Sequence, residues 1–551
     1  MRKMSGWRTG RRVSQVVFFA LFVALAALSQ VPRGFNQAVF DLTAAGRDLR
    51  LSAPVSLFFD LDPLAAVGTM LSARTLKTSL ALSLALLLTV MVLGRFFCGF
   101  ICPFGAANHL FTQAGRRLKL ARKIALNQPR PSRRIKYYLL VLLVLAAAAG
   151  SNQTGLLDPL SFLYRGLVLA VFPGLSQLSG LAADRLAGLP QPWSYLSFAG
   201  PFVADPVLGY GRRVYAGALL IGGLFLFVLV LNRWRPRFFC RVLCPLGALL
   251  GLFSRFSLAH LTKDQDKCTN CGLCRAECQG AAGPHPEEPW LRAECHLCFN
   301  CQAACPEEAL RFRLGPQSPV PVRDGPDLSR RTVLASLAGG AALLGLGRAG
   351  EASPERPRPD LIRPPGSLAE EEFLRRCIRC GLCLRVCPTN VLAPALFEAG
   401  AEGLWTPVLK FTLGYCEYSC TLCSSVCPTG AIRLITKKEK TETPLVLGSA
   451  FFDRGRCLPW SGQGPCLVCE EHCPVSPKAI YLTPLTVNTD RDRTETLLVP
   501  QVILERCVGC GICEYKCPVK GRPAVYITSV GETRSPANRI LLPRKPGELR
   551  R

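Results

Sequence analysis

The cysteines constrain this chain most, because all 28 of them fall into spaced groups and none is left over. Six groups of four lie outside the most apolar stretches. Four of these share the spacing C-x2-C-x2-C-x3-C, and they are Cys268, Cys271, Cys274 and Cys278; Cys295, Cys298, Cys301 and Cys305; Cys377, Cys380, Cys383 and Cys387; and Cys507, Cys510, Cys513 and Cys517. Two groups have wider gaps, and they are Cys416, Cys420, Cys423 and Cys427; and Cys457, Cys466, Cys469 and Cys473.

This spacing predicts [4Fe–4S] clusters, because three thiolates on one tight loop can each bind an iron of the cubane while a fourth arrives from a separate stretch. Proline follows the fourth cysteine in five of the six groups and turns the chain away. Zinc sites with four thiolates and disulfides are the alternatives. Zinc sites use separated pairs, whereas compact groups of four recur here, so we expect six [4Fe–4S] clusters.

Exchange of the fourth ligand between groups predicts which cysteines share a cluster. In the first two groups, we expect Cys305 to complete the set that begins at Cys268, and Cys278 to complete the set that begins at Cys295. For the last four groups, pairing of neighbours and pairing of first with fourth and second with third are equally open.

Charge and composition predict a membrane protein. The formal net charge is +28, and 49% of the residues are hydrophobic. Many basic residues flank apolar stretches, and residues 98–136 contain no acidic side chain, which is the positive-inside pattern of cytoplasmic loops. Residues 31–75 balance the two signs. We therefore expect membrane lipid as a partner, and no nucleic acid.

Four apolar stretches are long enough to cross the hydrocarbon core, which predicts a membrane α-helical bundle. They are residues 13–30, 76–97, 137–153 and 214–232. The first has the basic start of a signal peptide, but no small-residue cleavage site follows it, so we interpret it as an uncleaved anchor. The N-terminus and the first cluster domain are then expected in the cytoplasm, with residues 31–75 and 154–213 outside the inner membrane.

The membrane half contains an internal repeat. Residues 94–106, GRFFCGFICPFGA, reappear at 236–248 as PRFFCRVLCPLGA. The repeat predicts that four cysteines converge at the cytoplasmic end of a pseudosymmetric bundle, namely Cys98, Cys102, Cys240 and Cys244. These cysteines are expected to bind a further cluster or form a redox-active dithiol centre, and the alternative is that they pack the helix ends as structural thiols.

The bundle is also where we expect quinol, whose site needs an apolar cleft and a group that accepts protons. Asp62 and Asp158 each begin an Asp-Pro-Leu sequence upstream of one repeat copy, and His109 follows the first cysteine pair. These three residues are the candidate proton acceptors. The alternative is structural, because aspartate before proline often caps a turn.

A Ser-Arg-Arg-Thr-Val-Leu sequence at 329–334 separates the two halves, and a Gly- and Ala-rich apolar run follows it. This segment resembles the twin-arginine signals of exported proteins. A short cytoplasmic helix or a basic linker is the alternative. We expect export of residues 350–551 to the periplasm, with the segment as a possible fifth span.

The order of these motifs predicts four units and resembles two known families joined end to end. The units are a four-span membrane domain over 1–260, a two-cluster ferredoxin domain over 261–315, a linker over 316–365 and a four-cluster ferredoxin domain over 366–551, with small α+β ferredoxin-like folds. Residues 1–315 resemble the NapH-type membrane ferredoxin, and residues 325–551 resemble the NapG/MauM-type ferredoxin. The resemblance implies a quinol dehydrogenase module that passes electrons to a periplasmic reductase or cytochrome.

Two other functions remain open. In one, electrons enter from a cytoplasmic ferredoxin or flavoprotein at the first cluster domain. In the other, the chain is a redox assembly factor for a metalloenzyme or an enzyme with a quinone cofactor. Clusters on opposite sides of a layer about 30 Å thick need quinone, or a centre at the repeated cysteines, between them.

Overall fold

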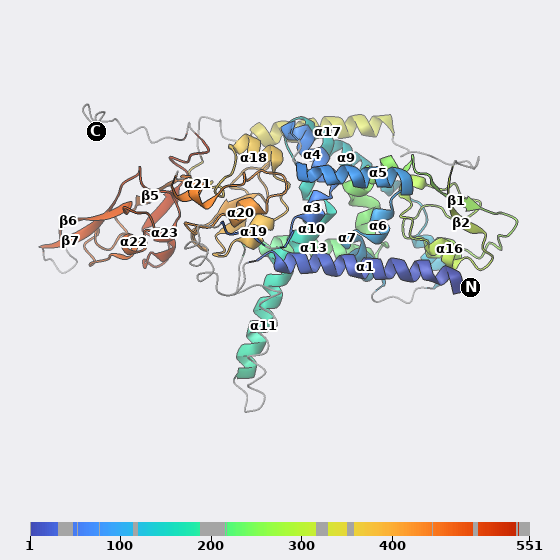
Figure 1. Cartoon of the computed structure of the whole chain (residues 1–551), viewed down its shortest axis with the longest axis horizontal. Coiled ribbons are helices and arrows are strands. Elements are labelled where there is room, and N and C mark those ends of the chain that lie inside the picture. Colours follow the sequence, from blue (N-terminus) through green and yellow to red (C-terminus); the bar gives the residue numbers. More distant parts are fainter. Residues whose placement is uncertain are drawn as a thin grey trace.

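The structure is a computed structural model in which three parts follow one another along a long axis (Figure 1). A helical bundle lies in the middle, with a first cysteine-rich domain (259–315) at one end and a second cysteine-rich domain (358–538) at the other. The residues described are 2–30, 48–51, 53–75, 78–113, 119–187, 215, 217–315, 329–349, 358–442, 445–488, 494–535 and 538. Parts of the predicted outer loops, of the linker and of the C-terminal tail lie outside these residues.

The bundle consists of one helix that runs along its whole length, α1, and shorter helices packed around it (Figure 1). The longer helices are α1 (Arg2–Leu28), α4 (Pro63–Ala73), α5 (Leu82–Leu93), α7 (Pro103–Gln113), α9 (Ile135–Ala148), α11 (Phe172–Ala187), α13 (Ala218–Val230), α14 (Pro245–Ser254) and α17 (Arg330–Ala349). Shorter turns join them, namely α3 (Leu57–Asp60), η1 (Thr78–Ala81), α6 (Phe96–Phe100), α8 (Leu120–Leu126), η2 (Pro131–Arg134), η3 (Thr154–Leu156), α10 (Pro159–Arg165), η4 (Gly166–Val171), η6 (Leu231–Arg233) and η7 (Phe239–Leu243).

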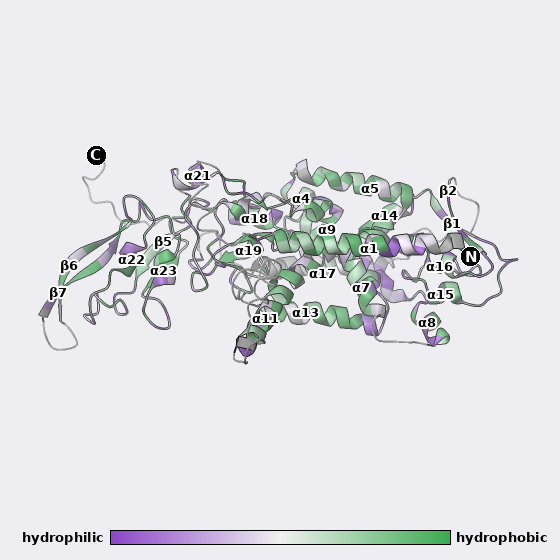
Figure 2. Ribbon diagram, turned by 60° about the horizontal axis from the view of Figure 1, so that its bottom comes forward, coloured by the Kyte–Doolittle hydropathy of each residue, from purple (hydrophilic) through white to green (hydrophobic). Residues whose placement is uncertain are grey.

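Two helical segments among the described residues are both long and apolar enough to cross a membrane, Gly6–Leu28 and Pro159–Arg185. The other predicted spans contain shorter apolar helices, α5, α9 and α13. Figure 2 shows that hydrophobic residues dominate these bundle helices. On α13, Leu219 is 93% exposed and Phe227 is 56% exposed, so apolar side chains face outward as well as inward.

The two copies of the repeat fold alike at their helix starts. The Asp62 carboxylate accepts a hydrogen bond of 2.9 Å from a backbone N–H in the first turn of α4, and Asp158 accepts one of 2.7 Å at the start of α10. At the starts of α7 and α14, the sulfurs of Cys102 and Cys244 likewise accept hydrogen bonds from backbone N–H groups, with N–S distances of 3.4 and 3.1 Å. Each of these four helices has proline at its first position, which has no N–H to satisfy. The expected capping role of the aspartates is therefore present.

The cysteine-rich domains combine short two-stranded antiparallel sheets with short helices. The strand pairs are β1 (Ala259–Lys263) with β2 (Leu310–Leu314), β3 (Leu392–Pro394) with β4 (Pro407–Leu409), β5 (Ser449–Phe452) with β8 (Val525–Thr528), and β6 (Ile480–Asn488) with β7 (Thr494–Val502). The helices are α15 (Leu273–Ala276), η8 (Arg292–Glu294), α16 (Asn300–Ala304), α18 (Glu370–Arg376), α19 (Leu382–Val386), α20 (Leu422–Ser425), α21 (Lys437–Thr441), α22 (Val468–Glu471) and α23 (Ile512–Lys516).

One hydrophobic core joins the bundle to the second domain. The cluster that contains Phe104 and Phe162 in the bundle continues through Leu384 and Phe411 to Ile527. The first domain has a separate core around Trp290. Because burial of apolar surface is the main force that holds domains together, the second domain is part of the bundle's own packing.

Candidate redox site

The first domain arranges its eight cysteines in two sets that exchange their fourth members. Set I consists of Cys268, Cys271, Cys274 and Cys305, and set II consists of Cys295, Cys298, Cys301 and Cys278. Burial raises the pKa of Cys274 to about 11, and the thiol of Cys305 contributes to this shift. In set II, burial and the thiol of Cys278 raise the pKa of Cys301 well above its usual range. The arrangement expected from the spacing is the one that the domain adopts.

The second domain exchanges ligands between neighbouring groups, beginning with the first two. Set III consists of Cys377, Cys380, Cys383 and Cys427, and set IV consists of Cys416, Cys420, Cys423 and Cys387. The Cys427 thiol interacts electrostatically with Cys377, and the Cys387 thiol does so with Cys416. Of the two pairings that the sequence allows, the structure therefore has the pairing of neighbours.

The last two groups follow the same rule. Set V consists of Cys457, Cys466, Cys469 and Cys517, and set VI consists of Cys507, Cys510, Cys513 and Cys473. Cys517 interacts electrostatically with Cys457, and Cys473 does so with Cys507. The second domain thus holds two pairs of sets, III with IV and V with VI.

The four sets of the second domain lie in an order that leads away from the bundle. Set III is nearest to it, because Tyr164 and Arg165 of α10 interact electrostatically with Cys380. Sets IV and VI meet where the backbone N–H of Cys416 donates to the carbonyl of Cys510 at 2.8 Å. The order from the bundle outward is therefore III, IV, VI, with set V attached to set VI.

Backbone geometry around the second cysteine of each regular group suits an anionic cluster. The residues on both sides of that cysteine have positive φ, and they are Asn270 and Gly272, Leu297 and Phe299, Arg379 and Gly381, and Gly509 and Gly511. Such left-handed residues turn successive N–H groups toward one concavity, where they can meet negative charge. The N–H of Arg379 accordingly reaches the sulfur of Cys377, and that of Gly509 reaches the sulfur of Cys507.

The donor chemistry of these sets fits iron–sulfur clusters. All 28 cysteines lie in the described part of the chain and are free thiols. Each set offers four cysteine sulfurs, and backbone donors to such sulfurs are among the features that set cluster potentials. Among the described residues, no group of three or more histidine, cysteine or acidic side chains is placed to hold a single metal ion.

The four cysteines of the repeat converge where the bundle meets the first domain. All of them interact electrostatically, namely Cys98, Cys102, Cys240 and Cys244. The Arg95 guanidinium lies 3.9 Å from the sulfur of Cys98. Arg241 donates to the carbonyl of Cys278 at 3.0 Å, and its charge also interacts with Cys240. Set II is therefore the cluster set nearest to the repeated cysteines.

The three candidate proton acceptors occupy opposite ends of the bundle. The carboxyl groups of Asp62 and Asp158 are close enough to interact electrostatically, and their exposed fractions are 0% and 2%. Two buried carboxylates repel each other, and a proton on one of them removes that repulsion. His109 lies at the first-domain end, with its ring 3.3 Å from the Gln279 side-chain nitrogen. Burial, followed by nearby arginines, lowers the pKa of His109 to about 2, so this imidazole is neutral and a poor proton acceptor.

The junction with the second domain is built around a buried arginine of the bundle. Arg165 donates at 2.8 Å to the carbonyl of Gly155 and at 2.8 Å to that of Arg379, beside set III. Its guanidinium lies 4.7 Å from the ring centroid of Trp405. The chains approach so closely that a Cβ on Gly155 would lie 1.7 Å from the carbonyl oxygen of Ile378. Set III is therefore held tightly against the bundle.

Sequence reasoning did not identify Arg165 or Trp405. Arg165 could have been noticed because it lies in an otherwise apolar stretch. A charged side chain is energetically costly in a membrane and generally has a partner there. Trp405 lies in the long loop between β3 and β4, and nothing in the sequence around it indicates its contacts.

Comparisons with known proteins agree with the cysteine sets. A family model described as "4Fe-4S binding domain" matches residues 76–122 and 215–263, one segment for each repeat copy. Models described as "4Fe-4S dicluster domain" match residues 376–431 and 294–392. The match over residues 294–392 covers the second cysteine group of the first domain and the first cysteine group of the second domain. The predicted ferredoxin-type domains are confirmed.

Similar proteins identify the family more closely. The ferredoxin-type protein MauM of Methylorubrum extorquens, named for methylamine utilization, is 35% identical over 189 residues, which are 33% of this chain and 80% of MauM. The chain belongs to the MauM and NapG family of ferredoxin-type proteins. NapG of Escherichia coli is 32% identical over 34% of this chain and 80% of its own length. The regulatory protein NosR of Stutzerimonas stutzeri is 29% identical over 39% of this chain and 24% of NosR.

These relatives confirm the predicted resemblance to NapG and MauM. The resemblance of residues 1–315 to the NapH type stays a prediction. No solved structure matches the chain. As a member of this family, the protein is an iron–sulfur electron-transfer protein.

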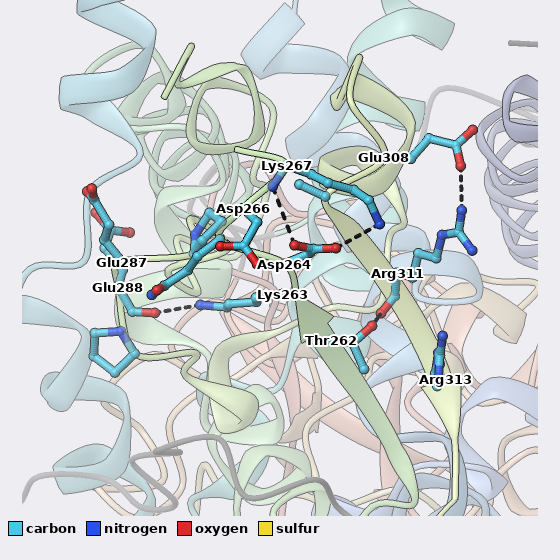
Figure 3. A pocket seen from close by; sticks show the side chains of 14 residues that line it. Thr262, Lys263, Asp264, Asp266, Lys267, Glu287, Glu288, Glu308, Arg311 and Arg313 are labelled. Carbon is cyan, nitrogen blue, oxygen red and sulfur yellow. Dashed lines mark hydrogen bonds and ion pairs between the residues drawn. The ribbon is translucent and has the colours of Figure 1, made fainter. Parts of the chain in front are cut away.

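A charged hollow of about 720 Å³ lies beside set I on the first domain (Figure 3). Its side chains largely pair with one another: Lys267 contacts Asp264 at 2.8 Å, and Arg311 contacts Glu308 at 2.6 Å. Lys263 donates to three backbone carbonyls. Cys271 of set I, in the same domain, is exposed.

Proposed function

We propose that this protein is an inner-membrane quinol dehydrogenase component that passes electrons from quinol through its [4Fe–4S] clusters to a periplasmic reductase or cytochrome. The observation that carries the proposal is the contact between set III and the bundle, through Arg165 and the shared core. A donor dissolved in the membrane can approach set III there, and sets IV and VI lead outward from it. Each bound cluster would supply the capacity to accept one electron at a time.

The separation of the two cysteine-rich domains supports a chain that crosses the membrane. They lie at opposite ends of an apolar bundle (Figures 1 and 2). The twin-arginine-like segment forms the 20-residue helix α17, and a helix of that length spans about 30 Å. This matches the hydrocarbon thickness. We infer that α1 crosses, that α5, α9 and α13 cross together with the short helices η1, η2 and η6 that extend them, and that α17 carries the chain to the periplasmic side as a fifth span.

The residues of this chain have distinct tasks in the proposed reaction. The cysteines of sets I to VI would hold six clusters, and the positive-φ backbone would place N–H groups toward them. Arg165 and Arg379 would fix set III beside the bundle. The Asp62–Asp158 pair would hold a proton close to the same junction.

The repeated cysteines are proposed as a seventh redox centre. Support comes from the match of a 4Fe-4S binding model to both repeat copies and from the convergence of the four thiols. A cluster or dithiol there would stand between set II and the interior of the bundle. The resemblance of residues 1–315 to the NapH type points to the same arrangement.

A second candidate function is electron exchange with a cytoplasmic ferredoxin or flavoprotein. The exposed Cys271 and the charged hollow beside set I favour it (Figure 3). Charged surfaces steer soluble partners together, and the resulting association weakens with salt. In this case electrons would enter at set I and move toward the bundle.

Purified protein in anaerobic lipid vesicles tests these alternatives. Addition of a reduced quinol should produce the electron paramagnetic resonance signals of reduced [4Fe–4S] clusters, in an amount comparable with part of the signal obtained with dithionite. Clusters that respond to a reduced soluble ferredoxin and never to quinol would favour the second function. A chain that responds to neither, but whose deletion leaves a partner enzyme without its cofactor, would indicate an assembly factor.

A further inference from the structure

An apolar pocket of about 520 Å³ lies between the bundle and the second domain. Leu142 and Ala146 of α9, Phe227 of α13 and Gly340 of α17 line its bundle side. The loop that joins β3 to β4 closes the other side. The volume falls within the range of small-molecule sites, about 300–1,000 Å³.

The pocket has access from the outside of the bundle. Leu224 and Phe227 line it, yet they are 38% and 56% exposed on the outward face of α13. In a membrane this face meets lipid. A ligand that enters here therefore comes from the hydrocarbon layer and has to be apolar over most of its length.

A single side chain separates this pocket from set III. Trp405 lines the pocket, and it also lines a smaller cavity together with Cys377, Cys380 and Cys427. The ring is 8% exposed and lies under the guanidinium of Arg165 at 4.7 Å. A ligand ring that packs against Trp405 is thus one aromatic side chain away from the cluster nearest to the bundle.

The backbone and the indole of Trp405 are both in costly arrangements. Its φ is 62°, a left-handed conformation that is unfavourable for a bulky residue. In the part of the chain that the structure describes, the buried indole N–H has no hydrogen-bond partner. Strain and a free buried donor of this kind cluster at ligand sites, where an oxygen of the ligand can accept the hydrogen bond.

The lining of the pocket is apolar apart from Ser151, Gln153 and Glu402. Glu402 is the single ionisable residue among the described residues that line the pocket, and its exposed fraction is 9%. Its backbone carbonyl accepts hydrogen bonds from Arg379 and from Gln153 of the bundle, which fixes the loop. Oxidation of a quinol releases protons, and Glu402 is placed to receive one.

We propose that this pocket is the quinol site, with Trp405 against the quinol ring and Glu402 as the first proton acceptor. The inference rests on the proposed function and specifies where it takes place. The quinol loses two electrons and two protons and becomes a quinone. The electrons reduce two oxidised [4Fe–4S] clusters of the second domain by one electron each, beginning at set III. One proton passes to the Glu402 carboxylate and the other to water.

Photolabelling with an azidoquinone provides a readout that does not depend on electron transfer. In the full-length protein in vesicles, label should appear in peptides that contain Glu402 and Trp405 or the facing part of α9. Excess unlabelled quinone should prevent it. Label in this pocket that unlabelled quinone does not displace would indicate a groove filled by lipid and would overturn the inference.

Two substitutions separate binding from proton transfer. Trp405→Leu should weaken labelling and raise KM for quinol about 10- to 30-fold, as expected for loss of a buried aromatic contact. Trp405→Phe should keep most of the binding, which guards against a folding defect. Glu402→Gln should leave labelling unchanged and slow quinol-dependent cluster reduction about 100-fold, and Glu402→Asp should restore part of the rate.

Matched controls come from the same domain. Trp460→Leu removes a tryptophan whose indole donates to Pro500 far from the pocket, and Glu371→Gln removes an exposed carboxylate on α18. Neither should change labelling or KM. If quinol reduces the wild-type clusters while labelling and KM do not respond to Trp405→Leu and the reduction rate does not respond to Glu402→Gln, the pocket is wrong and the function stands. If quinol never reduces wild-type clusters although the pocket is labelled competitively, the function is wrong and the pocket stands.

Discussion

Both ends of the bundle bury basic side chains, and a pair of these side chains at each end has different hydrogen-bond partners. At the first-domain end, Arg95 lies 3.6 Å from the Glu294 carboxylate, and Lys136 donates to the same group. At the second-domain end, Arg165 and Arg379 donate to backbone carbonyls. The charges of Arg165 and Arg379 also interact with the carboxylates of Asp158 and Glu402. A hydrogen-bonded carboxylate offsets a buried positive charge more fully than a carbonyl does.

This difference indicates a division of labour. The first end attaches its domain through a carboxylate shared by two basic groups and keeps set II beside the repeated cysteines. The second end places positive charge next to the thiols of Cys377 and Cys380, where an incoming electron adds negative charge. Opposite charge nearby stabilises the reduced form. The second end also contains the apolar pocket, so it is the end that we expect to react with quinol.

The largest expected effect comes from removal of a ligand of set III. Cys383→Ala should lower the iron content by about four atoms per chain, because one cubane is lost. It should also abolish quinol-dependent reduction of the remaining clusters in the second domain, while dithionite still reduces them. Iron analysis and electron paramagnetic resonance measure the two effects.

Cys513→Ala in set VI is the matched control for that loss. It should remove the same amount of iron, yet leave quinol-dependent reduction of set III, because set VI lies beyond set IV. Equal loss of quinol response in both variants would contradict the proposed order of the sets. The comparison between the two ends would then lose its functional meaning.

The carboxylate shared by Arg95 and Lys136 at the first end predicts the next largest effect. Glu294→Gln leaves Arg95 and Lys136 buried without an acidic partner, and we expect a loss of about 3–5 kcal/mol in the free energy of unfolding. Glu277 pairs with Arg8 and Lys123 at 3.7 and 3.9 Å near the surface of the same domain. Glu277→Gln should cost less than about 1 kcal/mol.

Thermal unfolding in detergent micelles can compare these two variants. A similar small shift for both would mean that the buried network at the first end contributes little. The assignment of this end as an attachment through the Glu294 carboxylate would then be wrong.

Local features of the sequence predicted much of the candidate site. The regular cysteine groups contain their own turn geometry, and Asp-Pro and Cys-Pro start helices wherever they occur, so these elements follow from residues that are neighbours in the chain. The pairing of the last four groups could not be predicted in this way. Both pairings satisfy the same spacing, and the choice depends on contacts such as that between Cys416 and Cys510.

Long-range contacts were beyond prediction for the same reason. The pocket needs α9, α13 and α17 together with the loop of Trp405, and no local pattern places Glu402 opposite Leu142. Helix ends also differ from the apolar stretches. The predicted span covers residues 137–153, but α9 already ends at Ala148. The helix ends there because Gly150 adopts a φ of 87° and turns the chain. Hydropathy responds to composition, whereas the backbone turn ends the helix.

The smallest effect concerns α17, which connects the two ends, and two adjacent glycines test whether it stays in the bundle. A Cβ on Gly340 would lie 2.8 Å from a terminal methyl of Leu142 on α9, whereas one on Gly339 would meet nothing within 4 Å. Gly340→Ala should therefore cost about 1 kcal/mol by overpacking, because a side-chain end can move aside. Gly339→Ala should stabilise the helix by about 0.5–1 kcal/mol. Opposite shifts in thermal unfolding are expected only if α17 remains packed against α9. If α17 is cleaved from the mature protein, the two variants will unfold alike, and the Arg165 junction, the shared core and contacts such as that of Ser72 with Arg375 will tie the second domain to the bundle.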